Sequence, residues 1–348
     1  MNVLIAYPNN LEDDNLFVST LANELLNIGV NIKVGLDEFW NSKEKYDIIH
    51  FQWPNSLFQD WTPTDVEIIF LEKRLIEIKN NSKILYTRHN SKPHYNQNKN
   101  VLKSYDLIEK YADAIVHLGS DDLENLKHNF NDKLHFIIPH HIYEFNATIT
   151  KEEARRKLKL PQKSFVVLTF GSYRNKVESD MVLTGFKNST IKNKILLATR
   201  VQKFYIKKAD RFSLKWIKNQ IIMFKFKLWN IYTKEEFVSN ENVQDYFIAS
   251  DVVLIQRLEV LNSGNLFMAF NFKKAVIGPN TGNVGQLLKE TGNILFNPLE
   301  NRSLSSNIEL AHNLDLNFIG KSNYEYAMNN LKINIIANKY KDVYERIQ

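Results

Sequence analysis

Short apolar runs alternate with amphipathic stretches throughout the first 150 residues. The runs have the length of buried strands and cover residues 3–7, 30–34, 46–51, 84–87, 114–118 and 134–138. Between them, apolar positions recur at helical spacing, as in Phe17, Leu21, Leu25 and Ile28. Further helices are expected over residues 63–78 and 102–111. Strands that alternate with helices of about 10–15 residues indicate a parallel, doubly wound α/β sheet.

The second half of the chain repeats this alternation. Strand-like runs cover residues 165–170, 195–198, 252–255 and 275–278, and helices are expected over 151–158, 242–249 and 265–272. Residues 323–347 predict one long helix. We therefore expect a first domain over residues 1–148, a second over 149–322, and a terminal helical segment over 323–348.

The charge differs between the two halves. Residues 1–150 carry 14 Lys and Arg against 21 Asp and Glu, whereas residues 151–348 carry 31 against 18. A basic second half suggests an anionic partner, such as a nucleotide, a phospholipid surface or a nucleic acid. No recognised nucleic-acid module accompanies the charge, so we do not expect nucleic-acid binding.

Composition also limits the compartment. The chain has no Cys, which excludes disulfides and thiolate chemistry and fits a reducing compartment. The first ten residues contain no basic signal-peptide start, and no run approaches the roughly 18 apolar residues of a membrane span. We expect a cytoplasmic protein.

Residues 251–285 form the stretch around which the second half is organised. An apolar run is followed by the corner Asn262-Ser263-Gly264, a helix, a second apolar run and a Gly-bearing loop. The free N–H groups and the positive dipole end at a helix start suit an anion such as a diphosphate. The alternative is an ordinary N-cap without a ligand.

A second anion-binding corner is expected after the run that ends at Phe170. Gly171 is followed by Arg174 and Lys176, directly before a helix. A Gly with two cations between a strand and a helix resembles a phosphate-binding corner. The pattern is neither a P-loop nor the dinucleotide fingerprint.

Histidines stand at the ends of several predicted strands of the first domain. They are His50, His89 with His94, and His140 with His141. Because ligands bind beyond the carboxyl ends of parallel strands, this set indicates a site, although each histidine also suits a structural hydrogen-bonding role. No ligand spacing supports a metal, and we expect none.

Residues 203–229 combine basic and large apolar side chains. Eight Lys and Arg stand against one acid, Asp210, with aromatic residues between them. This composition predicts peripheral docking on an anionic membrane, on the inner face of the plasma membrane. The alternative is a helix half-buried on its own domain with a solvated basic face.

Several motifs together resemble one enzyme family. They are DIIHFQWP at 47–54, HN..PH at 89–94, IPHHIY at 138–143, FGSYRNK at 170–176 and AVIGPNTG at 275–282. In this order they resemble family 4-type GT-B glycosyltransferases, and most of all the bacterial exopolysaccharide β-mannosyltransferase-like branch. The resemblance implies two Rossmann-like domains facing across a cleft, with the last helix crossing back to the first domain.

The resemblance also assigns roles by position. Arg174 and Lys176 match cations that bind the donor diphosphate, and His89 matches a residue near the reacting sugar. The remaining donor-binding positions are Gly171, Glu259, Ser263, Gly264 and Asn265. The expected acceptor-binding positions are His50, Trp53, His94, His140 and Tyr143.

The chain departs from the family at two places. The acidic pair that begins at Glu259 lacks its second member, because Phe267 stands eight residues later. The Gly-rich first loop of many relatives is replaced by Pro8-Asn9-Asn10. Ribose recognition and the retaining or inverting outcome are therefore left open.

The resemblance implies transfer of a sugar from a UDP- or GDP-linked donor to a saccharide or lipid-linked acceptor, without a metal, in bacterial surface polysaccharide synthesis. Fixed cations and backbone N–H groups would stabilise the leaving diphosphate. Two alternatives remain: a sugar-nucleotide epimerase or hydrolase on the same scaffold, and a non-catalytic binding protein.

Overall fold

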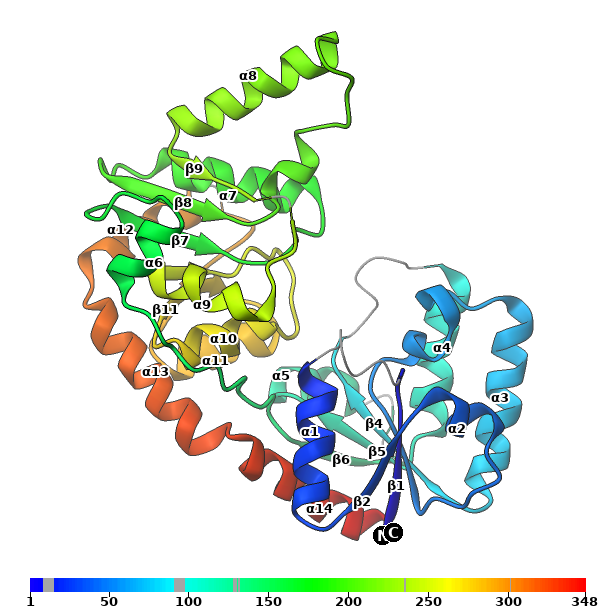
Figure 1. Ribbon diagram of the computed structural model, residues 1–348. Coiled ribbons are helices and arrows are strands. Elements are labelled where there is room, and N and C mark those ends of the chain that lie inside the picture. Colours follow the sequence, from blue (N-terminus) through cyan, green and yellow to red (C-terminus); the bar gives the residue numbers. More distant parts are fainter. Residues whose placement is uncertain (9–15, 91–97, 128–129, 131, 235, 301) are drawn as a thin grey trace. The chain divides into compact units, whose positions relative to one another are not determined.

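A computed structural model describes residues 1–8, 16–90, 98–127, 130, 132–234, 236–300 and 302–348. The chain divides into two compact units. The first contains Met1–His141 with Asn330–Gln348, and the second contains Ile142–Asn329. Each unit is built on its own parallel sheet of six strands, with helices on its faces (Figure 1). The prediction of an α/β chain with two Rossmann-like domains is thus confirmed.

The first unit has the strand order β2-β1-β3-β4-β5-β6. Its strands are β1 (Asn2–Ala6), β2 (Asn31–Val34), β3 (Ile48–Phe51), β4 (Lys83–Arg88), β5 (Ala114–His117) and β6 (Leu134–Ile137). Its helices are α1 (Leu16–Asn27), α2 (Leu36–Asn41), α3 (Asp65–Lys79), α4 (Lys99–Tyr111), α5 (Ser120–Leu126) and α14 (Ile333–Ile347), with 3-10 turns η1 (Pro54–Leu57) and η2 (Gln59–Trp61).

The second unit has the strand order β12-β11-β10-β7-β8-β9. Its strands are β7 (Phe165–Thr169), β8 (Lys194–Ala198), β9 (Ile231–Tyr232), β10 (Val252–Leu254), β11 (Ala275–Pro279) and β12 (Ile294–Phe296). Its helical elements are α6 (Lys151–Lys157), α7 (Lys176–Asn188), η4 (Val201–Phe204), α8 (Leu214–Leu228), α9 (Asn240–Ala249), α10 (Gly264–Asn271), α11 (Gly282–Glu290), α12 (Ser303–Asn313) and α13 (Leu316–Asn330).

The strand order places a topological switch point in each unit. In the second sheet the order reverses between β7 and β10, and in the first sheet it reverses around β1 and β3. At a switch point the loops after the two adjacent strands diverge, so that ligands bind outside the carboxyl ends of the strands. Every strand pairing in both sheets is parallel.

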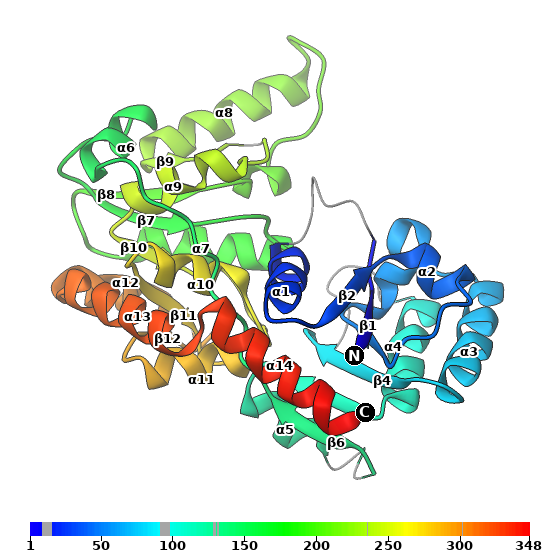
Figure 2. The same cartoon turned by 60° about the horizontal axis from the view of Figure 1, so that its bottom comes forward.

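The terminal segment differs from the single helix expected over residues 323–347. The helix ends at Asn330, Leu331 is buried, and Lys332 takes an extended conformation (φ −59°, ψ 144°) before α14 begins. No Gly or Pro marks this break, so the helical pattern continues across it. Figure 2 shows α14 with the first unit, and its residues Tyr340 and Tyr344 belong to that unit's core.

The boundary expected near residue 148 lies earlier, between His141 and Ile142. The segment that follows is bound to the second unit. The Asn271 side chain donates to the carbonyl of Phe145 at 2.8 Å, and the backbone N–H of Thr148 donates to the Gln244 side chain at 3.0 Å. These hydrogen bonds attach residues 145–148 to the second unit, and composition alone does not reveal them.

Candidate functional site

The carboxyl end of β7 is held by an amide cluster. The carbonyl of Phe170 accepts from the side-chain N–H₂ groups of both Asn265 and Gln256, each at 2.7 Å. Gly171 follows with a φ of +81°, a conformation that favours glycine, and a Cβ there would lie 3.8 Å from Asn265 Nδ2. The structure therefore brings Gly171 and Asn265 together at the switch point.

The start of α10 lies beside this cluster. Ser263 is the N-cap residue but makes no side-chain hydrogen bond to the first turn. Its hydroxyl therefore does not occupy the position that an anion takes at a helix start. A Cβ on Gly264 would lie 3.4 Å from Tyr143 Cε2. Tyr143, which we expected at the acceptor, thus packs in the second unit against a predicted donor-binding residue.

Arg174 joins the two loops of the switch point. Its guanidinium donates to the backbone carbonyl of Glu259 at 2.8 Å, and its backbone N–H donates to Glu178 Oε2 at 2.8 Å. The Glu259 side chain is exposed. The structure brings Arg174 and Glu259 together, and it places a cation between the two loops.

Lys176 is the first residue of α7, and its side chain contacts Asp180 and Tyr205. Its ammonium pairs with Asp180 at 2.5 Å and lies 5.2 Å from the centroid of the Tyr205 ring. The Tyr205 hydroxyl donates to the same Asp180 carboxylate. Lys176 is therefore exposed and already paired with a carboxylate.

A buried ion pair missed in the sequence braces these loops. Glu178 is 2% exposed and accepts from Arg257 Nη1 at 2.9 Å, while Arg257 Nη2 donates to the carbonyl of Ser172 at 3.0 Å. The Asn175 side chain accepts from the Glu178 backbone N–H and caps α7. An Asn followed three residues later by Glu is a helix-start signal, and it could have pointed to Glu178.

Three buried polar atoms lie in or near this loop region. Among the described residues, Gln256 Oε1, Thr281 Oγ1 and Asn283 Oδ1 have no hydrogen-bond partner. Buried polar atoms are normally paired, so three unpaired ones in neighbouring loops are unusual for a folded protein.

In the first unit, His89 follows β4 and is held between aromatic rings. Its imidazole stacks on the Trp53 indole with centroids 3.8 Å apart, and it lies perpendicular to the Phe17 ring with centroids 4.6 Å apart. His140 and His141 also contact Phe17, at 4.8 and 4.9 Å. The structure therefore brings four of the singled-out residues, Trp53, His89, His140 and His141, around one phenyl ring.

A hydrogen bond to Gln52 sets the tautomer of His89. His89 Nε2 lies 2.8 Å from Gln52 Oε1. An amide oxygen can only accept, so Nε2 carries the proton and the ring lone pair is on Nδ1. Burial, and then the neighbouring histidines, lowers the pKa of His89 well below its ordinary value. The side chain is therefore a neutral base with a defined orientation.

His50 is placed differently from the acceptor-binding residue we expected. It is fully buried; its Nδ1 lies 2.8 Å from the Tyr344 hydroxyl and its Nε2 lies 2.8 Å from Thr87 Oγ1. Gln52 Nε2 reaches the same His50 nitrogen at 3.0 Å, and burial lowers the pKa of His50 to about 3. His50 therefore links β3 to α14 through Tyr344 and lies within hydrogen-bonding distance of the Gln52 side chain. We assign it a structural role.

A second polar network surrounds Arg88, the residue before His89. Arg88 donates to Glu109 at 2.9 Å and pairs with Asp122, which in turn accepts from His117 at 2.6 Å. All four side chains are buried. The network was not foreseen, because its members are spread over β4, β5, α4 and α5 without a recognisable spacing.

One predicted site residue has no described position, and two kinds of feature are not found among the described residues. His94 lies outside the described residues. Among the residues that the structure does describe, no group of His, Cys, Asp and Glu could hold a metal ion. Over the same residues, no helix has the length and apolar character needed to cross a bilayer.

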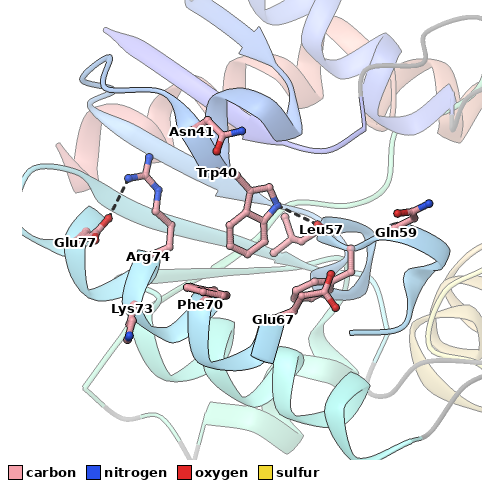
Figure 3. Close-up of a pocket in the computed structure, with 10 residues that line it drawn as sticks. Trp40, Asn41, Leu57, Gln59, Glu67, Phe70, Lys73, Arg74 and Glu77 are labelled. Atoms are coloured by element: carbon pink, nitrogen blue, oxygen red, sulfur yellow. Dashed lines mark hydrogen bonds and ion pairs between the residues drawn. The ribbon is translucent and has the colours of Figure 1, made fainter. Parts of the chain in front are cut away.

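A separate hollow of about 620 Å³ lies on the first unit between α2, η2 and α3 (Figure 3). Trp40 and Phe70 line it, and the polar groups of Trp40 and Arg74 are bound within the unit. The Trp40 indole N–H donates to the carbonyl of Leu57, and Arg74 binds the carbonyls of Phe39 and Ser42 and the Glu77 carboxylate. We assign this hollow no ligand.

The fold is shared with solved glycosyltransferase structures. Sucrose-phosphate synthase from Thermosynechococcus elongatus is 14% identical, with a TM-score of 0.71 over 99% of this chain and 98% of that chain. Anabaena HepE in complex with UDP is 12% identical, with a TM-score of 0.70 over 99% and 100%. The catalytic domain of Arabidopsis thaliana starch synthase IV, bound to ADP and acarbose, is 11% identical, with a TM-score of 0.65 over 99% and 98%.

At these identities the likeness establishes the fold, which is the GT-B arrangement of two Rossmann-like domains in one chain. No protein-family model matches the sequence. No curated protein matches it at the level of sequence either.

Proposed function

We propose that this protein is a nucleotide-sugar-dependent glycosyltransferase. The observation that carries the proposal is the switch point of the second sheet, where Gly171, the uncapped start of α10 and Arg174 converge. The shared fold supports it, because similar structures include HepE with UDP-glucose. The donor is a UDP- or GDP-linked sugar, and it needs no metal.

The proposed role of the second unit is to stabilise the leaving group. Glycosyl transfer breaks the bond between the anomeric carbon and the phosphate, so negative charge grows on the diphosphate. The N–H groups at the start of α10 and the guanidinium of Arg174 stabilise that charge. The buried pair of Glu178 and Arg257 keeps the two loops in place before the donor arrives, which lowers the ordering cost of binding.

The proposed role of the first unit is to bind the acceptor and handle its proton. Trp53 offers a partly exposed ring surface for a saccharide or the sugar of a lipid-linked acceptor, and the buried His140 packs behind it on Phe17. His89 takes the proton of the acceptor hydroxyl at Nδ1 while Gln52 holds Nε2. The sequence resemblance supports a place in bacterial surface polysaccharide synthesis, with the transferred sugar a hexose such as mannose.

Binding and turnover measurements test the proposal in two stages. Calorimetry with UDP, GDP and their sugars identifies the nucleotide, and Arg174→Ala should weaken its binding. Release of free nucleotide diphosphate is then measured with and without saccharide acceptors. Release that requires an acceptor supports a transferase. Equal release without an acceptor indicates a hydrolase. Conversion of the nucleotide-sugar to its epimer, with no release of nucleotide diphosphate, indicates an epimerase. Absence of binding to every nucleotide would overturn the proposal.

A further inference from the structure

Helix α8 presents a second apolar face that its own unit does not use. It lies next to β9 at the end of the second sheet (Figure 1). Of its 15 residues only Phe226 is buried, and Ile222 packs partly on the same core. These two residues, with Trp216 and Asn219, form the face turned toward the unit.

The opposite face carries an exposed apolar stripe. Its members are Leu214, Ile217, Ile221, Phe224 and Leu228, which recur every three or four residues and so share one side of a helix. Leu214 is 86% exposed, Phe224 61% and Leu228 63%. Phe212, just before the helix, is 71% exposed. A contiguous stripe of this kind on a soluble domain marks an interaction surface.

Basic side chains surround the stripe. By helical position, Lys218 and Lys225 flank it on one side and Lys227 flanks it on the other. Residues 203–229 hold eight Lys and Arg against the single acid Asp210, and none of the eight forms an ion pair within this fully described segment. The charges are therefore available to an anionic partner.

The surface is held in shape without a partner. The Ser213 side chain caps the helix by accepting from the Trp216 backbone N–H at 3.1 Å. Asn219 clips the preceding loop to the helix, because its side chain donates to the Lys207 carbonyl at 2.7 Å and accepts from the Lys207 N–H at 3.3 Å. The Trp229 ring at the other end lies 3.8 Å below the Lys187 ammonium.

We propose that this face of α8 docks the protein on an anionic lipid bilayer, with the stripe at the level of the acyl boundary and the lysines among the headgroups. Charge complementarity selects this occupant. A second copy of the chain would oppose one set of basic residues to another, with Asp210 as the only nearby acid. A helix of 15 residues, about 22 Å long, lies in the membrane plane, and long lysine stems let the ammonium groups reach phosphates while the stripe is buried.

Vesicle co-sedimentation of the full chain tests the proposal, and it needs no turnover, so its outcome is independent of the proposed enzymatic function. We expect binding to vesicles of 70% phosphatidylcholine and 30% phosphatidylglycerol, and much weaker binding to pure phosphatidylcholine. Each basic residue near an anionic surface contributes about fivefold to the partition coefficient. The variant with Lys215, Lys218, Lys225 and Lys227 changed to Glu should therefore lose at least about a hundredfold.

Two matched controls separate the surface from bulk charge and hydrophobicity. Changing the exposed Lys159, Lys163, Lys192 and Lys289 to Glu alters the net charge equally but should reduce binding far less. Ile217, Ile221 and Phe224 changed to Gln should lower binding at least about tenfold. The same change at Val66, Ile69 and Phe70, which are exposed on α3, should leave it nearly unchanged.

A fluorescent label reports insertion. The chain has no Cys, so Ile221→Cys can be labelled uniquely with an environment-sensitive dye. A blue shift with anionic vesicles, absent for a label at Lys192→Cys, supports docking through α8. Equal binding to both vesicle types, no binding, or an equal loss in the control variants would overturn the proposal. A lipid-independent dimer that the Gln variant abolishes would show that a second copy covers this face instead.

Discussion

The two candidate sites at the strand ends treat charge in opposite ways. In the first unit, His50, His89 and His140 are buried and their pKa values are lowered by burial, so they are neutral at physiological pH. In the second unit, Arg174 and Arg257 are permanently charged and are held by carbonyls and a buried carboxylate. Both sites sit at the carboxyl edge of a parallel sheet of six strands.

This difference separates a proton-handling site from an anion-holding site. A neutral histidine with a fixed tautomer can accept a proton, and burial makes the protonated form unfavourable. An arginine cannot titrate in a protein, so it supplies a constant positive charge to a diphosphate. The fold is similar in the two units, and the chemistry is set by the side chains at the strand ends.

The strongest test of the comparison is His89. His89→Ala should lower turnover by about 10²–10⁴-fold, since a positioned general base contributes that much. Donor affinity should be unchanged, because the residue belongs to the first unit. Turnover is measured with saturating donor and acceptor, and nucleotide binding is measured by calorimetry on the same variant.

Structural damage would mimic this result, so His89→Gln is a second variant that keeps a hydrogen-bonding partner for Gln52. Melting curves give the folded fraction of each variant. If both variants melt early but keep normal activity per folded molecule, His89 is a bracing residue only.

The second test removes the charge that holds the cationic loops. Glu178→Gln leaves Arg257 buried opposite a neutral amide, and breaking a buried pair in this way costs about 3–5 kcal/mol. The free energy of unfolding from urea titration measures the loss. Glu241→Gln, at an exposed position of the same unit, is the matched control and should change stability by less than about 0.5 kcal/mol. Equal effects in both variants would contradict the bracing role.

The third test compares the two predicted phosphate-binding cations. Arg174→Ala should weaken nucleotide diphosphate binding by about 10- to 100-fold, the value of a charge-assisted contact of roughly 1.5–3 kcal/mol. Lys176→Ala should weaken it less, because its ammonium is paired with Asp180 and exposed. Calorimetry measures the affinity of each variant for the preferred nucleotide, and Lys192→Ala, at an exposed position outside the two loops, is the control. Wild-type affinity in Arg174→Ala would remove Arg174 from the donor site.

The fourth test uses the pH dependence of the free energy of unfolding to ask whether His50 is neutral in the folded protein. An unfolded histidine has a pKa of about 6.5, and burial lowers the pKa of folded His50 to about 3. Below pH 6.5 the unfolded chain takes up a proton that the folded chain does not, so the free energy of unfolding falls as the pH falls. For this one residue the slope is about 0.7 kcal/mol per pH unit at pH 6.5, and it approaches about 1.4 kcal/mol per pH unit between about pH 5.5 and the folded pKa.

His50→Gln should therefore reduce the loss of stability between pH 6.5 and 5.5 by about 1 kcal/mol, because the unfolded histidine is half protonated at pH 6.5 and almost fully protonated at pH 5.5. The comparison rests on the slope, which is independent of any constant loss of stability in the variant. His312→Gln removes an exposed imidazole of the second unit and serves as control. An unchanged slope in His50→Gln would show that folding does not lower the pKa of His50.

Local pattern predicted the six strands of the first sheet and four strands of the second, because each is a short apolar run that is buried in a parallel sheet. It missed β9 and β12, which have only two and three residues. Strand-end positions such as Gly171 and His89 followed from the predicted strands, since parallel strands deliver the residues after them to one edge. The break between α13 and α14 did not follow, because Leu331 and Lys332 are acceptable helix residues and only packing interrupts them.

The sequence by itself determined the α/β class, the two sheets, the uneven charge and the residues that reach the strand ends. Only the tertiary structure decided what those residues do there. His50 is buried and contacts α14 through Tyr344, and Tyr143 packs against Gly264 in the second unit. Lys176 pairs with Asp180, and Glu178 pairs with Arg257, 79 residues later in the chain. The physical reason is that periodicity reports which way a side chain points within its own element. Burial, hydrogen-bond partners and pKa depend on residues that are distant in sequence.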